Sequence, residues 1–391
     1  MDRQSYIEQQ FENFPFKLLG ELINGWENAQ SFGDVEMKLP GGFSGTTYVV
    51  TNPQRALDEH NPVIVKLYSN ETRSGIPKEI DIVKILSDIK WGPHVYYVCD
   101  TFRIEQFQDA RNMNIWEMRN PHYVEQIIMK LMDFDHHPEM IQKVQSYFDG
   151  KRLSTLDILK YEKYPKFIEK IPSIIEKIDA DIYKDYKDII MDMQKEWVDT
   201  NLVELIDQLF PEKYTDDDLV LSHNDCQQGN ILVYRKDQAK IVIIDYEDTS
   251  FGPKFLDISS FLGCFMKDNE HPEPPYIKIY YENTISEWEL RYYTEFYLKR
   301  YHQLYYKGDK SLDEYLIQES QKFYEDLICG IIFFNIYFGV WGITYLREEF
   351  TLNHSSFFTL AKNRILMNRY FMNQEFVKKV LDTRLIKKQI I

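Results

Sequence analysis

Cysteine is scarce in this sequence and is not spaced for metal binding. The four cysteines, at positions 99, 226, 264 and 329, form no closely spaced pair, which argues against the zinc sites that such pairs build. We expect free thiols in a reducing compartment. The polar N-terminus, residues 1–5, lacks an apolar signal segment, so we expect a cytoplasmic protein.

Positive charge is also in deficit. The 62 acidic residues outnumber the 46 lysines and arginines, which gives a net charge of −16. Such a chain repels the phosphate backbones of nucleic acids, so we expect no nucleic-acid partner, whereas a negative field favours a cationic substrate. Internal repeats and low-complexity tracts are absent. The 391 residues, 44% of them hydrophobic, are enough for about two lobes.

One stretch is long and apolar enough to cross a membrane. Residues 327–346 contain no charged side chain, and that length can span a bilayer. The stretch also contains Asn335 and Thr344, and a pair of acidic residues lies close to each end. A helix buried in a large lobe has the same composition, so we expect no stable membrane insertion.

The first part of the chain is predicted to be a small sheet with one helix. Runs of β-branched and aromatic residues predict strands over residues 46–50, 63–68 and 95–107. Apolar residues recur at Ile80, Val83 and Leu86, a spacing that predicts a helix over 79–89.

Helical patterns dominate beyond residue 110, for example over 123–134 and 184–210. Strands are predicted in one island, over residues 219–221, 231–234 and 240–245, with a hairpin turn at 235–238. We therefore expect an α+β, protein-kinase-like fold with two lobes. The small β-rich lobe, residues 1–107, would bind nucleotide, and the large, mainly helical lobe, residues 108–391, would hold the catalytic and substrate-binding residues.

The most informative segment is Ser-His-Asn-Asp-Cys-Gln-Gln-Gly-Asn at 222–230. Phosphoryl transfer needs a carboxylate that orients the acceptor hydroxyl and takes its proton, and oxygen ligands for magnesium. Asp225 stands five residues before Asn230 on a loop that enters a strand, and Asp245 ends the next strand. An ordinary polar loop explains one such Asp or Asn, but not the whole set.

This segment, with Ile-Asp-Tyr-Glu at 244–247, resembles the signature of choline and ethanolamine kinases. The resemblance implies that Asp225 is the catalytic base, that Asn230 and Asp245 are catalytic magnesium ligands, and that Gln227 and Glu247 support the site. Glu247 is expected to contact the metal, and Asp225, Gln227 and Glu247 to contact the substrate.

Two neighbouring positions bear on the same resemblance. Gln228 stands where the family often has Glu. Asp257 matches a family Asp that supports the catalytic loop, although a lone Asp there could equally be a helix cap.

The β-rich lobe carries a second set of family features. Gly41 and Gly42 precede a predicted strand. Glycines let a backbone approach phosphates, although Pro-Gly-Gly is also a common turn. A lysine on the next strand followed by a helix Glu is the phosphate-binding pair of kinases, although a solvated lysine on an edge strand would look the same. The expected nucleotide-binding residues are Gly41, Gly42, Ser44, Lys66, Glu79 and, at the hinge that meets adenine, Glu105, Gln106 and Phe107.

The substrate side departs from the family. Phe338 and Trp341 occupy the place of a tryptophan pair three residues apart, which lies on one helix face, and Phe357 falls where a tyrosine is expected. Helix packing alone would also explain these aromatics. Cys264 and Asn269 fall where the family has an acidic residue and an aromatic, and two weakened cation contacts would lower choline affinity roughly tenfold or more.

The resemblance implies ATP and Mg²⁺ as cofactors, choline or ethanolamine as the acceptor, a role in phospholipid head-group synthesis, and dimers as a common assembly. Two alternatives stay open. The acceptor could be another amino alcohol or an amino sugar, as in aminoglycoside phosphotransferases, or the chain could be a non-catalytic regulatory protein with a kinase fold.

Overall fold

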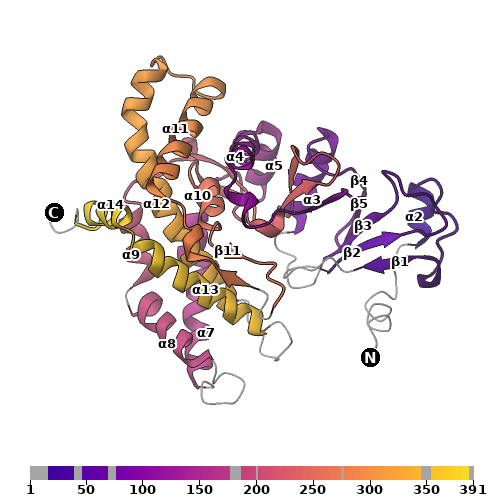
Figure 1. The fold of residues 1–391 in the computed structure, drawn as a ribbon, viewed down its shortest axis with the longest axis horizontal. Coiled ribbons are helices and arrows are strands. Elements are labelled where there is room, and N and C mark those ends of the chain that lie inside the picture. The colour runs from indigo at the N-terminus through magenta and orange to yellow at the C-terminus, as the bar shows by residue number, and fades with distance from the viewer. Residues whose placement is uncertain are drawn as a thin grey trace. The chain divides into compact units, whose positions relative to one another are not determined.

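The structure is a computed structural model and describes residues 16–38, 46–68, 76–176, 186–199, 201–273, 277–344 and 354–386. The chain divides into two compact units (Figure 1). The first contains Met1–Arg111 and Val233–Glu247, and the second contains Asn112–Leu232 and Asp248–Ile391. The first unit thus takes in a segment from the middle of the chain.

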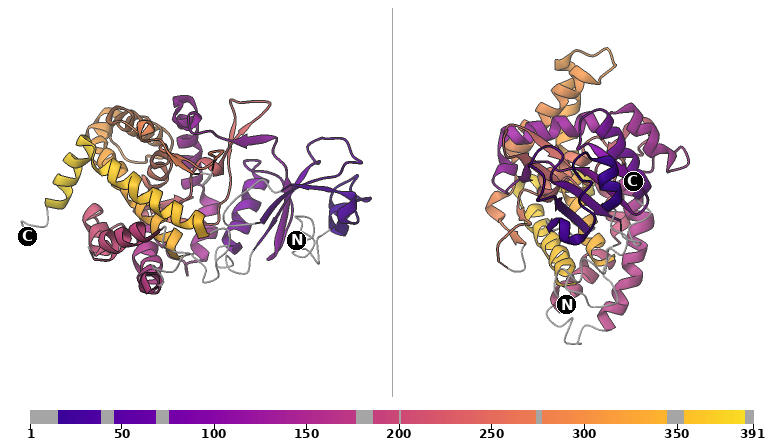
Figure 2. Two further views of the ribbon diagram at one scale, coloured as in Figure 1. Left: turned by 60° about the horizontal axis from the view of Figure 1, so that its bottom comes forward. Right: turned by 90° about the vertical axis from the view of Figure 1, so that its right-hand side faces the viewer.

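A five-stranded antiparallel sheet forms the centre of the first unit (Figure 2). Its order is β1-β2-β3-β5-β4, and among the described residues one helix precedes the sheet and one lies between β3 and β4. The elements are α2 (Phe16–Leu22), β1 (Glu36–Lys38), β2 (Thr46–Thr51), β3 (Val63–Leu67), α3 (Ile76–Asp88), β4 (Val95–Val98) and β5 (Phe102–Gln106).

Alternation along β2 and β3 buries one face of this sheet. Tyr48, Val50, Val63 and Val65 are fully buried in one hydrophobic cluster with Trp26, so the segment after α2 covers that face. The single strand predicted over 95–107 is instead two strands, because the chain turns at residues 99–101.

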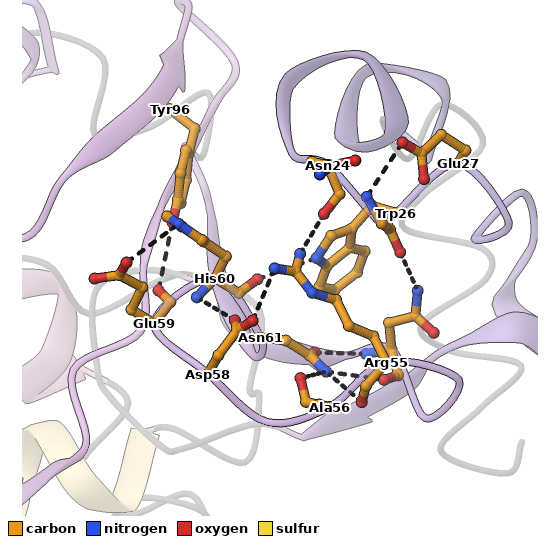
Figure 3. A network of polar contacts seen from close by, with 12 residues as sticks. Asn24, Trp26, Glu27, Arg55, Ala56, Asp58, Glu59, His60, Asn61 and Tyr96 are labelled. Atoms are coloured by element: carbon orange, nitrogen blue, oxygen red, sulfur yellow. Dashed lines mark hydrogen bonds and ion pairs between the residues drawn. The ribbon is translucent and has the colours of Figure 1, made fainter.

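The loop between β2 and β3 is held by one buried asparagine (Figure 3). The Asn61 side chain accepts from the backbone N–H of Asn52 at 2.9 Å and donates to the carbonyls of Asn52 and Arg55 at 3.0 and 3.1 Å. Trp26 donates its Nε1–H to the carbonyl of His60 at 3.0 Å. The loop therefore satisfies its own buried polar groups, as a buried turn must.

Helices dominate the second unit (Figure 1). They are α4 (Pro121–Asp135), α5 (Pro138–Ser146), α6 (Thr155–Ile158), α7 (Tyr164–Glu176), α8 (Lys187–Met193), α9 (Leu202–Leu209), α10 (Leu256–Gly263), α11 (Glu287–Leu304), α12 (Leu312–Thr344), α13 (His354–Met372) and α14 (Glu375–Ile386). The continuous helix predicted over 184–210 is broken between α8 and α9, where Asn201 adopts a left-handed conformation (φ 55°) and caps α9.

Short strand pairs frame the catalytic segment. β7 (Leu219–Ser222) pairs antiparallel with β10 (Ser250–Pro253), and β11 (Lys267–Asp268) pairs with β12 (Lys278–Ile279). β8 (Ile231–Tyr234) and β9 (Ile241–Ile243) are neighbours in a three-stranded sheet with β6 (Ala110–Asn112). The predicted hairpin is present, and β9 ends before Asp245, which has a positive φ of 70°.

The apolar stretch of the sequence lies in α12. This helix packs against α10, α11 and α13, and its most apolar 18-residue window is 89% buried. Residues 327–344 therefore belong to a core helix, while residues 345 and 346 lie outside the described residues.

Glycine lets α12 approach α10 closely. A Cβ added at Gly330 would lie 2.3 Å from Ser259 Oγ and 2.6 Å from Ser259 Cβ. Gly330→Ala should therefore lower the free energy of unfolding by about 1–3 kcal/mol, although helix propensity alone favours alanine by about 1 kcal/mol. Urea unfolding measures the change. Gly33→Ala is the control, because its nearest atom would be Ser31 Oγ at 3.6 Å; equal stability of the two variants would contradict the close approach.

Candidate active site

One carboxylate in the second unit anchors the predicted catalytic segment, residues 222–230. Asp257, in the first turn of α10, is 2% exposed. It accepts from Ser222 Oγ at 2.9 Å, from the N–H of His223 at 2.6 Å and from the N–H of Asn224 at 2.8 Å. Charge-assisted bonds of this kind are the strong ones, so Asp257 supports the catalytic loop as the family resemblance implies.

Asn224 forms the turn that follows. Its backbone is left-handed (φ 66°), a conformation that asparagine tolerates better than most residues. Its Nδ2 donates to the carbonyls of Ser222 and Asp248 and to Ser250 Oγ at 2.9–3.1 Å, and Thr155 Oγ1 donates to its Oδ1 at 2.8 Å. The conformation of the chain just before Asp225 is therefore tightly determined.

Three of the predicted site residues meet beyond this turn. Asn230 Nδ2 donates to Asp225 Oδ2 at 2.7 Å and to the Asp225 carbonyl at 2.9 Å. Gln227 Nε2 donates to the same Oδ2 at 3.1 Å. Asp225 and Gln227 are half-buried, so a carboxylate with a fixed orientation stands near the surface of the loop.

Residues around β11 complete this group, and sequence reasoning missed one of them. Asn269 Nδ2 donates to Gln227 Oε1 at 2.8 Å, and Lys267 Nζ donates to the same oxygen at 3.5 Å. Lys267 is 2% exposed, and burial, followed by the charge of Arg364, lowers its pKa to about 7. In the sequence, the only feature that could have indicated a buried Lys267 is its position directly after the apolar run 261–266.

The first unit holds a separate cluster of buried charges. Lys66 on β3 donates to Glu79 Oε1 on α3 at 2.9 Å and to Asp245 Oδ1 at 2.7 Å, and Glu247 Oε2 lies 3.8 Å away. Burial favours a lower pKa for Lys66, but Asp245 and Glu79 outweigh it and raise that pKa well above its ordinary value. Lys66 is therefore a fixed cation.

Arg103 on β5 is a member of this cluster that the sequence did not reveal. Its Nη1 lies 2.5 Å from Glu79 Oε1 and its Nε lies 2.8 Å from Glu105 Oε2. Burial acts to raise the pKa of Glu79, but Arg103 and Lys66 overcome it and lower that pKa to about 2. Glu105, expected at the hinge, is thus held by an arginine.

The other predicted nucleotide residues differ in what surrounds them. Gln106 ends β5 and its Oε1 accepts from Gln108 Nε2 at 3.2 Å. Phe107 follows it and is half-buried. Gly41, Gly42 and Ser44 lie outside the described residues.

The predicted substrate aromatics in the second unit differ in their neighbours. The Trp341 and Phe357 rings lie 5.7 Å apart. Phe338, 6% exposed, has the Arg364 guanidinium over its ring, 4.6 Å from the centroid. Arg364 Nη2 also donates to the sulfur of buried Cys264 at 3.7 Å. One face of Phe338 is therefore already covered by a cation from this chain.

These features can be compared with known proteins. The family model for choline/ethanolamine kinase matches residues 37–371. The chain belongs to the choline/ethanolamine kinase family. Among its relatives, probable choline kinase 2 of Arabidopsis thaliana is 23% identical over 346 residues, covering 86% of this chain and 88% of the relative. The choline/ethanolamine kinase of Homo sapiens is 22% identical over 355 residues, with 87% and 82% covered.

Solved structures agree on the fold. A choline kinase from Cryptosporidium parvum Iowa II matches with a TM-score of 0.66 at 19% identity, covering 95% of this chain and 97% of the other. A Plasmodium vivax ethanolamine kinase matches with a TM-score of 0.61 at 19% identity, with 89% and 84% covered. The predicted α+β, protein-kinase-like class is confirmed, and the protein is a kinase by family.

The lowered pKa of Lys267 in this kinase predicts a pH effect on stability. Between about pH 7 and pH 10 the unfolded chain keeps a proton on Lys267 that the folded chain has released, so the free energy of unfolding rises with pH. The expected contribution is about 1 kcal/mol per pH unit. Urea unfolding of the wild type and Lys267→Met at pH 7, 8 and 9 measures it. Parallel curves for the two proteins would contradict the buried, depressed lysine.

Proposed function

We propose that this kinase transfers the γ-phosphoryl group of ATP to the hydroxyl of choline or ethanolamine, the acceptors after which its family is named. The observation that carries the proposal is the carboxylate of Asp225, held by Asn230 and Gln227 on a loop that Asp257 anchors. Such an orientation suits a group that positions an acceptor hydroxyl and takes its proton.

The proposed reaction is a direct displacement. The acceptor oxygen attacks the γ-phosphorus, the bond from that phosphorus to the β,γ-bridging oxygen breaks, and ADP leaves. The hydroxyl proton passes to Asp225. The two donors on Asp225 Oδ2 hold the carboxylate in one orientation, and positioning is the main protein contribution to phosphoryl transfer.

Magnesium would be held by Asn230, Asp245 and Glu247. Carboxylate and amide oxygens are the donors that this ion prefers, and it usually takes only one or two carboxylates besides phosphate oxygens and water. Asp248 follows Asp245 by three positions in the sequence, and its carbonyl accepts from Asn224 Nδ2. When bound, the ion would neutralise charge on the triphosphate.

The nucleotide would meet the first unit. Lys66, fixed by Glu79 and Asp245, has the charge and the strand position to contact the α- and β-phosphates. Gly41, Gly42 and Ser44 would cover the phosphates, and Glu105, Gln106 and Phe107 would face adenine. The family resemblance supports each of these assignments.

For the acceptor, Trp341 and Phe357 offer adjacent ring faces, which attract ammonium groups. Phe338 and Glu247 complete the proposed substrate contacts. Phosphorylated amino alcohols serve phospholipid head-group synthesis, and we propose this role for the reaction. We also propose a cytoplasmic dimer without membrane insertion.

Replacing the proposed base tests the reaction. Asp225→Ala should lower kcat by about 10²–10⁴-fold while the Kd for ADP stays within about twofold, because the carboxylate acts on the acceptor and not on the nucleotide. A coupled assay of ADP release and ADP titration measure the two quantities. Asp217→Ala, at an exposed carboxylate upstream, is the control. Transfer that persists unchanged in Asp225→Ala would contradict the assignment of Asp225 as the base.

A further inference from the structure

Two cations of the first unit share one carboxylate oxygen. Lys66 on β3 and Arg103 on β5 are partners in the antiparallel register of these two strands. Lys66 Nζ lies 2.9 Å from Glu79 Oε1, and Arg103 Nη1 lies 2.5 Å from the same atom. The second oxygen, Oε2, is buried and has no hydrogen-bond partner in the part of the chain that the structure describes. Glu79 is therefore divided between two cations, whereas the usual kinase pair has one lysine and one glutamate.

The three side chains are deeply buried. Lys66 is 6% exposed, Glu79 is 0% exposed and Arg103 is 5% exposed. Removing one partner from a buried ion pair is costly, because it leaves the other charge uncompensated. A ligand that draws Lys66 away from Glu79 would therefore bind weakly unless Glu79 keeps a second cation.

The charge of Arg103 already weakens the attachment of Lys66. Burial acts to lower the pKa of Lys66, whereas Asp245 and Glu79 raise it well above its ordinary value. The like charge of Arg103 acts against these two carboxylates. Glu79 thus attracts Lys66 less strongly than it would if Arg103 were absent.

The other carboxylates near Lys66 have an alternative partner as well. Lys66 Nζ lies 2.7 Å from Asp245 Oδ1 and 3.8 Å from Glu247 Oε2. Asp245 and Glu247 are proposed magnesium ligands, so each would have a metal partner when the nucleotide is bound. Glu79 would have Arg103. Lys66 is then the cation that remains for the α- and β-phosphates.

Arg103 is held too firmly to move with Lys66. Its Nε lies 2.8 Å from Glu105 Oε2, and its Nη1 donates to the Tyr68 hydroxyl at 3.3 Å. A guanidinium presents its donors in a rigid fork and serves several acceptors at once, whereas a lysine ammonium lies at the end of a flexible stem. Arg103 can therefore stay with Glu79 while Lys66 reorients.

We propose that Arg103 is a positioning residue for nucleotide binding, which retains Glu79 so that Lys66 can turn to the phosphates of ATP. The inference rests on the proposed contact of Lys66 with those phosphates, and it adds the residue that releases Lys66 to make this contact. Arg103 acts through Glu79 and not on the phosphates.

Nucleotide binding tests this proposal. Among the described residues, Arg103→Met leaves Glu79 with one cation, Lys66. The Kd for AMP-PNP with Mg²⁺, measured by isothermal titration calorimetry, should rise about tenfold or more, the size of a lost charge-assisted bond. The KM for ATP should rise by a similar factor while kcat stays within about twofold, because the α- and β-phosphates are bound alike in the ground and transition states. Arg103→Lys keeps the charge and should recover most of the affinity; an unchanged Kd in Arg103→Met overturns the proposal.

A double-mutant cycle shows whether Arg103 acts through Glu79. In a Glu79→Gln background no carboxylate at this position retains Lys66, so adding Arg103→Met should change the Kd less than about twofold. Replacing both members of a buried ion pair is often neutral for stability, so this comparison also covers the case in which Arg103→Met alone does not fold. A tenfold loss in the Glu79→Gln background would mean that Arg103 does not act through Glu79, and it would overturn the proposal.

Arg55→Met is the matched control. Arg55 is an arginine of the same unit, and its Nη2 lies 2.9 Å from Asp58 Oδ2 in the loop between β2 and β3 (Figure 3). This variant should bind AMP-PNP as the wild type does. An equal rise in Kd for Arg55→Met and Arg103→Met would show a general effect of lost positive charge and overturn the proposal. A lower melting temperature of Arg103→Met with an unchanged Kd would show a purely structural role and also overturn it.

Binding and turnover separate this inference from the proposed function. If neither choline nor ethanolamine is phosphorylated, the proposed function fails, but titration with AMP-PNP and Mg²⁺ still decides the role of Arg103, because it needs no acceptor. If an acceptor is phosphorylated and Arg103→Met binds the nucleotide as tightly as the wild type, the proposed function stands and this inference fails.

Discussion

The proposed site depends on the hydrogen bonds that Asp257 accepts from the loop that carries Asp225. One buried carboxylate accepts from three consecutive residues, Ser222, His223 and Asn224, and fixes the left-handed turn that precedes Asp225. Asp135 lies behind it, and burial, followed by the charge of Asp257, raises the pKa of Asp135 well above its usual range. A neutral Asp135 avoids repulsion between the two carboxyl groups.

The buried lysine and arginine side chains of the two units differ in their partners. In the first unit, Lys66 and Arg103 share Glu79, and each has a further carboxylate partner in Asp245 or Glu105. In the second unit, Lys267 and Arg364 have only neutral hydrogen-bond partners. The balanced cluster of the first unit suits a nucleotide whose phosphates arrive with a metal.

Local sequence was enough to predict that Asp225 and Asn230 meet, because they are near neighbours in a turn between two strands. It was also enough for the core helix α12. It could not reveal the contact of Arg103 with Glu79, 24 residues away, or that of Arg364 with Cys264, 100 residues away, because only tertiary packing brings these residues together. The break in the strand at residues 99–101 and the break in the helix at Asn201 were not predicted. Strand and helix propensities do not show where within a run of favourable residues the chain turns.

The central claim is that Asp257 holds the loop that carries Asp225. Measuring kcat for Asp257→Asn tests it most directly. This change keeps the shape of the side chain but replaces one acceptor oxygen with an NH₂ group that would face a backbone N–H. We expect kcat to fall at least about tenfold, because the loss of even one charge-assisted bond displaces the loop. The circular dichroism spectrum and the Kd for ADP should stay close to those of the wild type. An unchanged kcat in a folded Asp257→Asn enzyme would show that Asp225 does not depend on this anchor.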